Sequence, residues 1–219
     1  MIFYQLSIKS RVEQAGAIQE NALSPTEHGN EDYKDITHMA GIPLSNSIEP
    51  RYRYVAFDVE TTGLSPKNGD RMIEIGAVAI EGRSIVAEFS SLMNAGKNIP
   101  WHVQQVHGIT NKMLKGEPQP DEVLPEFFKF ISGSILVAHN ASFDIRFLKH
   151  EFELLGMGLN NRSLCTLKMS RKQYPHLPNH KLETVGRYLF GNSCEQMQMH
   201  RALDDAKLAA MIWLEMGKG

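Results

Sequence analysis

Cysteine is scarce in this chain of 219 residues, and its two cysteines form no recognisable pattern. The spacing of Cys165 and Cys194 is neither that of a metal-binding pair nor part of a disulfide framework. This usage is typical of proteins in a reducing compartment, so we expect a cytoplasmic protein that does not depend on disulfides.

Long hydrophobic runs are also missing. No apolar run approaches the roughly 20 residues that a helix needs to span a bilayer. The apolar start of the chain, residues 1–4, has no preceding basic region and is too short for a secretory signal. With 42% hydrophobic and 22% charged residues the composition is that of a globular protein, and we expect no membrane association.

The chain has no large excess of either charge, because 23 Lys and Arg face 25 Asp and Glu for a net charge of −2. This balance argues against a strongly basic surface for nucleic acid. The charge is unevenly distributed, however: residues 1–50 hold seven acids against three bases, whereas residues 161–190 hold one acid against six bases. The six bases could attract phosphates or could be ordinary solvated charges; they are Arg162, Lys168, Arg171, Lys172, Lys181 and Arg187.

The chain divides by composition into an N-terminal extension, residues 1–50, and a domain, residues 51–219. Ser10 and Glu13 have the spacing of a capping box, which predicts a short helix over about residues 10–23. Residues 24–50 are rich in Ser, Pro, Asn, Gly and Asp and are typical of a loop or linker.

From residue 52 onward, alternating strand and helix patterns predict an α/β domain with a mixed β-sheet. Strands are expected at 54–58, 72–80, 85–93 and 135–139, with the second and third joined as a hairpin. Helices are expected at 121–132, 142–155, 182–189 and about 201–216.

Two carboxylates stand at the end of the first expected strand. Asp58 and Glu60 are two positions apart, so their side chains point to the same face of the strand. Adjacent carboxylates repel each other unless a cation lies between them, and Mg²⁺ prefers such oxygen ligands. A pair of solvated acids at a strand edge would also account for them.

Two further acids begin expected helices. Asp144 falls in the first turn of its helix, where the helix dipole favours a negative charge and already explains an acid. In the last helix the apolar stripe places Asp204 nearly opposite the buried face and Asp205 on its flank, where it can reach a cleft. His200 precedes this helix and could be an exposed or capping histidine.

Together these segments resemble the three motifs of the DEDDh exonucleases, also called DnaQ-like, in order and spacing. The motifs are Asp58-Val-Glu-Thr-Thr-Gly63, His139-Asn-Ala-Ser-Phe-Asp144 and His200-x4-Asp205. The resemblance covers residues 52–216 and includes Val106-His-Gly-Ile-Thr110, a segment often found between the first two motifs. The family includes the proofreading epsilon subunit of bacterial DNA polymerase III and ribonuclease T.

The resemblance implies a ribonuclease H-like mixed sheet flanked by helices, and an enzyme that removes nucleotides one at a time from a 3′ end. It implies two Mg²⁺ or Mn²⁺ ions per active site, with Asp58 shared between them, and His200 as general base. Histidine suits that role because its side chain titrates near neutral pH. The implied metal ligands are Asp58, Glu60, Asp144 and Asp205, and the positions that approach the terminal nucleotide are Thr61, His107 and Phe143.

We therefore expect a 3′–5′ exonuclease acting on DNA 3′ ends in proofreading or repair, with a DNA polymerase subunit as one potential partner. A ribonuclease T-like enzyme that trims RNA is an alternative with the same motifs, because discrimination of the 2′-hydroxyl depends on pocket shape. A scaffold that docks a polymerase through residues 1–50 is a second alternative. The sequence leaves the oligomeric state open.

Overall fold

The computed structural model describes residues 52–191 and 200–218. The extension 1–50, its expected helix and loop, and Cys194 lie outside the described residues. Within the described part of the chain, no helix is both long enough and apolar enough to cross a membrane.

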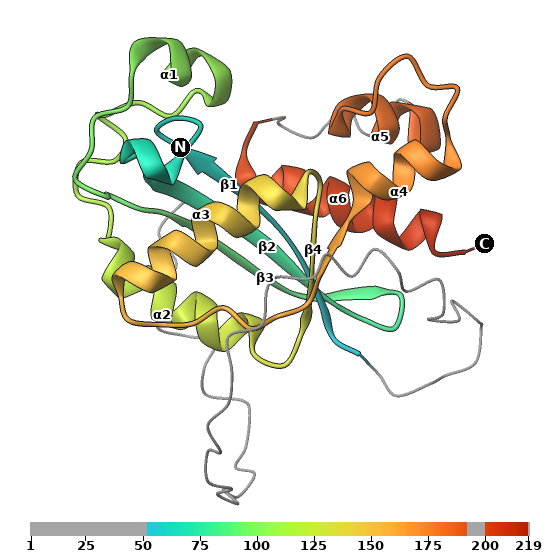
Figure 1. Cartoon of the computed structure of the whole chain (residues 1–219), viewed down its shortest axis with the longest axis horizontal. Helices are drawn as coiled ribbons and strands as arrows, with labels where there is room; N and C mark the ends of the chain where they lie inside the picture. The colour runs from blue at the N-terminus through green and yellow to red at the C-terminus, as the bar shows by residue number, and fades with distance from the viewer. Residues whose placement is uncertain (1–51, 192–199, 219) are drawn as a thin grey trace, which may run out of the picture. The chain divides into compact units, whose positions relative to one another are not determined.

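One five-stranded mixed sheet organises the described residues, in the order β3-β2-β1-β4-β5 (Figure 1). Its strands are β1 (Tyr54–Thr61), β2 (Met72–Glu81), β3 (Ser84–Leu92), β4 (Ile135–Ala138) and β5 (Ser163–Cys165). The first three strands pair antiparallel, and β4 pairs parallel with both β1 and β5. The expected α/β class and mixed sheet are confirmed.

Helices cover both faces of this sheet. They are α1 (Trp101–His107), α2 (Pro120–Ile131), α3 (Ala141–Leu154), α4 (Thr166–Gln173), α5 (Leu182–Phe190) and α6 (Ala202–Met216), with a short 3₁₀ turn, η1 (Pro66–Asn68). Alternate β1 residues such as Phe57 pack with α2 and α3, whereas the intervening Ala56 packs with Ala210 and Trp213 of α6. A further apolar cluster joins α4 and α5 to α6. The period-two alternation of β1 thus sorts its side chains between two cores.

Three elements of the structure were not predicted from the sequence. Helix α1 has only seven residues, enclosed between Pro100 and Gly108, and β5 has three, so neither is long enough to show a period. Helix α4 is mostly polar and exposes much of its surface, so it carries no apolar stripe. Strand β1 also continues to Thr61, because its last residues pair with β2.

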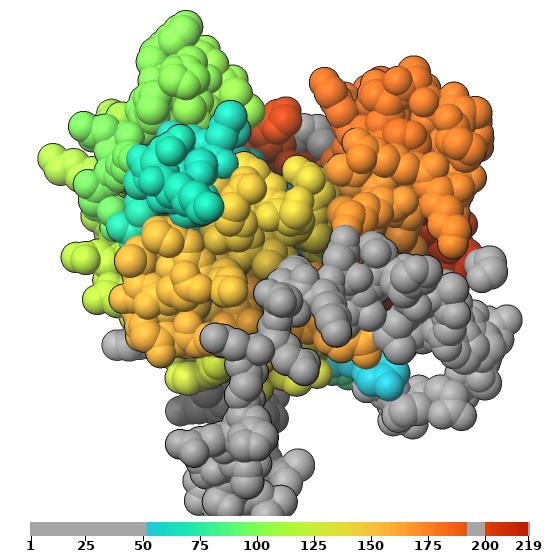
Figure 2. Space-filling model, viewed as in Figure 1, coloured from blue at the N-terminus to red at the C-terminus, as the bar shows by residue number. Residues whose placement is uncertain are grey.

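The surface of the described residues has a notch between the segment that includes α1 and the segment of α4 and α5 (Figure 2). Figure 2 shows the notch between the green segment that includes α1 and the orange segment of α4 and α5, with red atoms of the C-terminal segment at its floor.

The N-terminal end of α6 lies directly against β2 at Gly76. A Cβ atom at Gly76 would lie 2.1 Å from the backbone nitrogen of Leu203 and 2.2 Å from the carbonyl carbon of Ala202. A backbone cannot yield as a flexible side chain does, so only glycine permits this approach.

We predict that Gly76→Ala lowers the free energy of unfolding by about 2 kcal/mol or more, because the added methyl group must push α6 away from the sheet. Urea denaturation followed by circular dichroism measures the change. Gly158→Ala is the control, since a Cβ there meets nothing within 4 Å and its φ is not positive. Equal stability of the two variants would contradict the prediction.

Candidate active site

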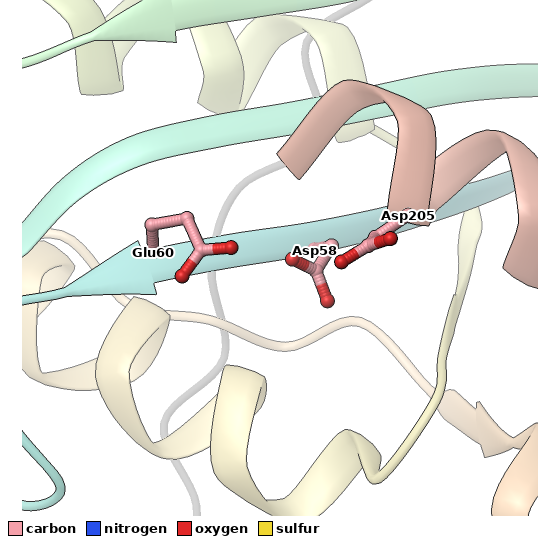
Figure 3. Close-up of side chains that lie close together, drawn as sticks. All are labelled: Asp58, Glu60 and Asp205. Atoms are coloured by element: carbon pink, nitrogen blue, oxygen red, sulfur yellow. The ribbon is translucent and has the colours of Figure 1, made fainter. Parts of the chain in front are cut away.

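Strand β1 and helix α6 bring three carboxylates together. Asp58 and Glu60 extend from the same face of β1, and Asp205 comes from the first turn of α6 (Figure 3). Each of the three offers an oxygen within 4.8 Å of the oxygens of the other two. Residues almost 150 positions apart in sequence therefore form one acidic cluster.

The turn between β4 and α3 positions the fourth acid, Asp144. Because β4 runs parallel to β1, with Val137 opposite Ala56, the chain that leaves β4 emerges beside Asp58. Asn140 adopts a left-handed conformation, with φ of 72°, and α3 begins at the next residue. Asp144 is 2% exposed and lies near enough to Asp58 to raise its pKa, although it is not part of the 4.8 Å cluster.

The four acids are held in an electrostatically unfavourable arrangement. Burial raises the pKa of Asp58 well above its usual range, and the charges of Asp144, Glu60 and Asp205 raise it further. Burial likewise raises the pKa of Glu60 to about 8, that of Asp144 to about 7 and that of Asp205 to about 6. Backbone N–H groups of Asp144 and Val59 oppose the shift at Asp144. In the absence of a cation, ionising this cluster costs free energy.

The donor set fits a hard divalent cation. Among the described residues, Oδ1 of Asp205 is buried and has no hydrogen-bond partner, while Oδ2 accepts a hydrogen bond from the His200 backbone N–H at 3.1 Å. A buried oxygen without a partner is costly, and a bound cation would remove that cost. Clustered carboxylate oxygens are the ligands that Mg²⁺ and Mn²⁺ prefer.

His200 and Asp204 flank this cluster differently. His200 is exposed and adopts a left-handed backbone conformation, with φ of 61°, immediately before α6. The bend directs its N–H toward Asp205 and leaves the imidazole accessible. Asp204 stays partly exposed and is not one of the three clustered acids, as expected from its angle on the helix.

Thr61, His107 and Phe143 lie at or next to the elements that carry the acids. The Thr61 hydroxyl donates to the Gly63 carbonyl at 2.6 Å. Nδ1 of His107 accepts the Ile109 N–H at 3.0 Å, and burial lowers the pKa of His107, an effect that the Thr61 carbonyl opposes. Phe143 is half-buried on α3, in the turn of helix that carries Asp144.

Sequence reasoning missed one charged pair beside the site. Glu74, 3% exposed on β2, forms an ion pair of 2.7 Å with Arg201 at the start of α6. The only indication in the sequence was that Glu74 is the single acid inside the otherwise apolar run of residues 72–80. A buried acid of this kind requires a partner, but the sequence did not indicate which.

The fold is that of nucleases already solved. The chain is similar to exonuclease X in complex with 5′-overhanging duplex DNA, with a TM-score of 0.60, 26% identity, and 75% of this chain and 90% of that one covered. The nuclease domain of 3′hExo, a DEDDh family member, has a TM-score of 0.65 at 18% identity, with 77% and 92% covered, which shows the fold alone. Fold and acidic cluster together define a nuclease with a ribonuclease H-like fold.

The chain belongs to the exonuclease family described as RNase_T: Exonuclease, whose profile matches residues 55–213. DNA polymerase III subunit epsilon of Aquifex aeolicus is 39% identical over 163 residues, with 74% of this chain and 79% of that protein covered. DNA polymerase III PolC-type of Clostridium perfringens is 45% identical over 159 residues, covering 73% of this chain and 11% of that protein.

The chain thus spans 11% and 12% of the length of the two PolC-type proteins that it matches at 45% and 42% identity. The resemblance to DEDDh exonucleases, which hydrolyse phosphodiester bonds and depend on divalent metal ions, is confirmed.

We predict that, in a chelator, the melting temperature falls as the pH rises from 5.5 to 8.5. The folded-state pKa values of Glu60, Asp144 and Asp205 lie above their ordinary values, so the folded state binds more protons than the unfolded state across this range. The contribution of these protonated carboxyl groups to the free energy of unfolding, which is present near pH 4, is therefore lost as the pH rises through about 6 to 8.

Asp58→Asn should reduce this fall and raise the melting temperature at pH 8.5, because it removes one of the repelling charges. Asp204→Asn, outside the cluster, should keep the wild-type slope. Scanning calorimetry over this pH range measures both. An Asp58→Asn slope equal to that of the wild type would refute the account of carboxylate repulsion.

Proposed function

We propose that this protein is a 3′–5′ exonuclease acting on DNA, with two Mg²⁺ or Mn²⁺ ions held by Asp58, Glu60, Asp144 and Asp205. The observation that carries the proposal is the meeting of three carboxylates from β1 and α6 within 4.8 Å, next to the buried Asp144. The 39% identity to a DNA polymerase III epsilon subunit supports DNA as the polymer.

Divalent cations bound there would neutralise the negative charge that develops on the attacking and leaving oxygens of a phosphodiester. The protein's own contribution is to hold the oxygen ligands in place. Asp58, on the central strand of the sheet, lies between Glu60 and Asp205 in Figure 3, and it is proposed as the ligand that both ions would share. The four acids extend from one strand and two helices, and a site built on such regular elements has a more precisely fixed geometry than one built on loops.

His200 is proposed to take the proton of the attacking water. Its imidazole is exposed, while its backbone is fixed by the hydrogen bond to Asp205. Thr61, His107 and Phe143 are proposed to contact the terminal nucleotide. Among the described residues, Nε2 of His107 is buried without a hydrogen-bond partner, although the Thr61 carbonyl lies near enough to raise the pKa of the ring.

The six basic residues of segment 161–190 are proposed to attract the phosphates of the substrate strand. All six are exposed, and Lys168, Arg171 and Lys172 follow one another at helical spacing on α4. Arg187 also pairs with Glu183 at 3.0 Å, so it would contribute less. Phosphate contacts of this kind add affinity that weakens with salt.

The similarity to PolC-type and epsilon proteins of DNA polymerase III also supports a role for this protein beside a DNA polymerase, in proofreading or repair. Docking of a polymerase through residues 1–50 is the alternative function that the sequence left open, and a pull-down with that segment fused to a carrier tests it.

The decisive experiment is digestion of 5′-labelled oligonucleotides in Mg²⁺ or Mn²⁺, with matched single-stranded DNA, duplex, mismatched duplex and RNA. We expect ladders shortened one nucleotide at a time from the 3′ end, faster on DNA than on RNA. Asp58→Ala is the negative control. Preferred digestion of RNA would favour a ribonuclease T-like enzyme, and internal cuts or no cleavage would overturn the proposal.

We predict that Asp205→Asn lowers the cleavage rate at least about 100-fold, because it removes a ligand charge worth several kcal/mol in the transition state. Asp204→Asn should cleave near the wild-type rate, since its carboxylate lies outside the cluster. Initial rates on one DNA oligonucleotide compare the two variants. The opposite ranking would show that the assignment of α6 residues is wrong.

We predict that His200→Ala retains wild-type affinity for Mn²⁺ but cleaves about 10²- to 10⁴-fold more slowly, the usual contribution of a positioned acid–base group. His200→Asn, which tolerates the left-handed φ, controls for backbone strain. Calorimetric titration with Mn²⁺ and a pH–rate profile check both variants. Loss of Mn²⁺ binding would make His200 a ligand or a support, and wild-type cleavage would exclude it as the base.

A further inference from the structure

Glu74 is a buried acid next to the cluster, and within the described residues its carboxylate accepts hydrogen bonds from the beginning of α6. Its Oε1 accepts hydrogen bonds from Nη2 of Arg201 at 2.7 Å and from Nε at 3.1 Å. Its Oε2 accepts the Ala202 backbone N–H at 3.1 Å and a longer bond from Nε of Arg201 at 3.3 Å. Both oxygens are thus occupied by protein donors.

These contacts hold the short segment that carries His200 and Asp205, two proposed active-site residues. Arg201 follows His200 directly, and its carbonyl accepts the Asp205 N–H at 3.0 Å in the first turn of α6. Glu74 lies opposite Glu60 in the pairing of β1 with β2. One side chain therefore connects the strand beside the acidic cluster to the helix end that supplies Asp205.

Resting on the proposed function, we infer that Glu74 is a positioning residue, which holds His200 and Asp205 in place through Arg201 and Ala202. It is not a metal ligand, because its two oxygens already accept hydrogen bonds from these donors. Gly76, two residues along β2, assists by letting the same turn of α6 approach the strand. Together they determine how far Asp205 lies from Asp58.

The chemistry of the pair explains why these residue types are needed. Glutamine at position 74 could offer one acceptor oxygen but would turn its NH₂ group toward donors, so at least one hydrogen bond would be lost. Lysine at position 201 would keep the charge but lose the planar pair of N–H groups that engages the carboxylate. An acid without its partner in this position would add to the repulsion within the cluster.

Glu151 on α3 offers a matched control. It is 1% exposed and accepts hydrogen bonds from Nε and Nη2 of Arg71, both at 2.8 Å, and from the Met72 N–H at 3.0 Å. The type and number of donors nearly match those of Glu74. The difference is that its partners lie at the beginning of β2 rather than at the start of α6.

The test compares Glu74→Gln, Arg201→Lys and Glu151→Gln with the wild-type full chain. Three quantities are measured: the melting temperature, the affinity for Mn²⁺ by calorimetry without nucleic acid, and kcat and KM on single-stranded DNA. We expect both glutamine variants to lower the melting temperature by similar amounts. Glu74→Gln and Arg201→Lys alone should weaken Mn²⁺ binding and reduce kcat about 10- to 100-fold, with KM nearly unchanged.

Wild-type Mn²⁺ affinity in Glu74→Gln would overturn the inference, and so would an equal loss of affinity in Glu151→Gln, which would indicate a general effect of stability. Wild-type affinity in Arg201→Lys would show that charge alone matters and would also overturn it. If Glu74→Gln does not fold, Arg201→Lys carries the test. Because Mn²⁺ binding is measured without nucleic acid, the inference is decided even if the wild type shows no exonuclease activity.

Discussion

Mutual repulsion among four neighbouring carboxylates, two of them buried and two half-buried, is the constraint on which this structure depends. Asp58, Glu60, Asp144 and Asp205 come from one strand and two helices, and burial and neighbouring charges raise the pKa of each. Such a cluster destabilises the protein at neutral pH unless cations enter it. The rest of the fold must therefore hold these side chains together against a force that separates them, and a rigid sheet between two apolar cores does so.

The two acids that come from helices reach the cluster by different routes. Asp144 lies in the first turn of α3, which follows the buried strand β4 after two residues, whereas Asp205 lies in the first turn of α6, which is preceded by the exposed His200 and by Arg201. Glu74, on β2, accepts hydrogen bonds from the start of α6, and Gly76 on the same strand allows the helix backbone to approach closely. Under the proposed function, the same contacts that stabilise the fold would also control the separation of the proposed metal-binding oxygens, so that stability and catalysis would be coupled at this turn.

Local pattern predicted most of the fold. The apolar run of β2, the hairpin to β3 and the apolar stripe of α6 are visible in the sequence, because each has a period and a length that distinguish it. Helix α1 and strand β5 are too short to show one, and α4 exposes most of its polar surface. These three gain their structure from what they pack against, so a reading based on periodicity could not find them.

The sequence by itself grouped Asp58, Glu60, Asp144 and Asp205 as proposed ligands through the spacing of their motifs. It also placed Asp58 and Glu60 on one face of β1, because strand alternation is a local property. It also separated Asp205 from Asp204 by their angle on a helix. Only the tertiary structure decided that Asp205 reaches Asp58 and that Glu74 pairs with Arg201. Those two residues lie 127 positions apart. A contact between them has no period and no spacing rule, and it forms only when α6 packs onto β2.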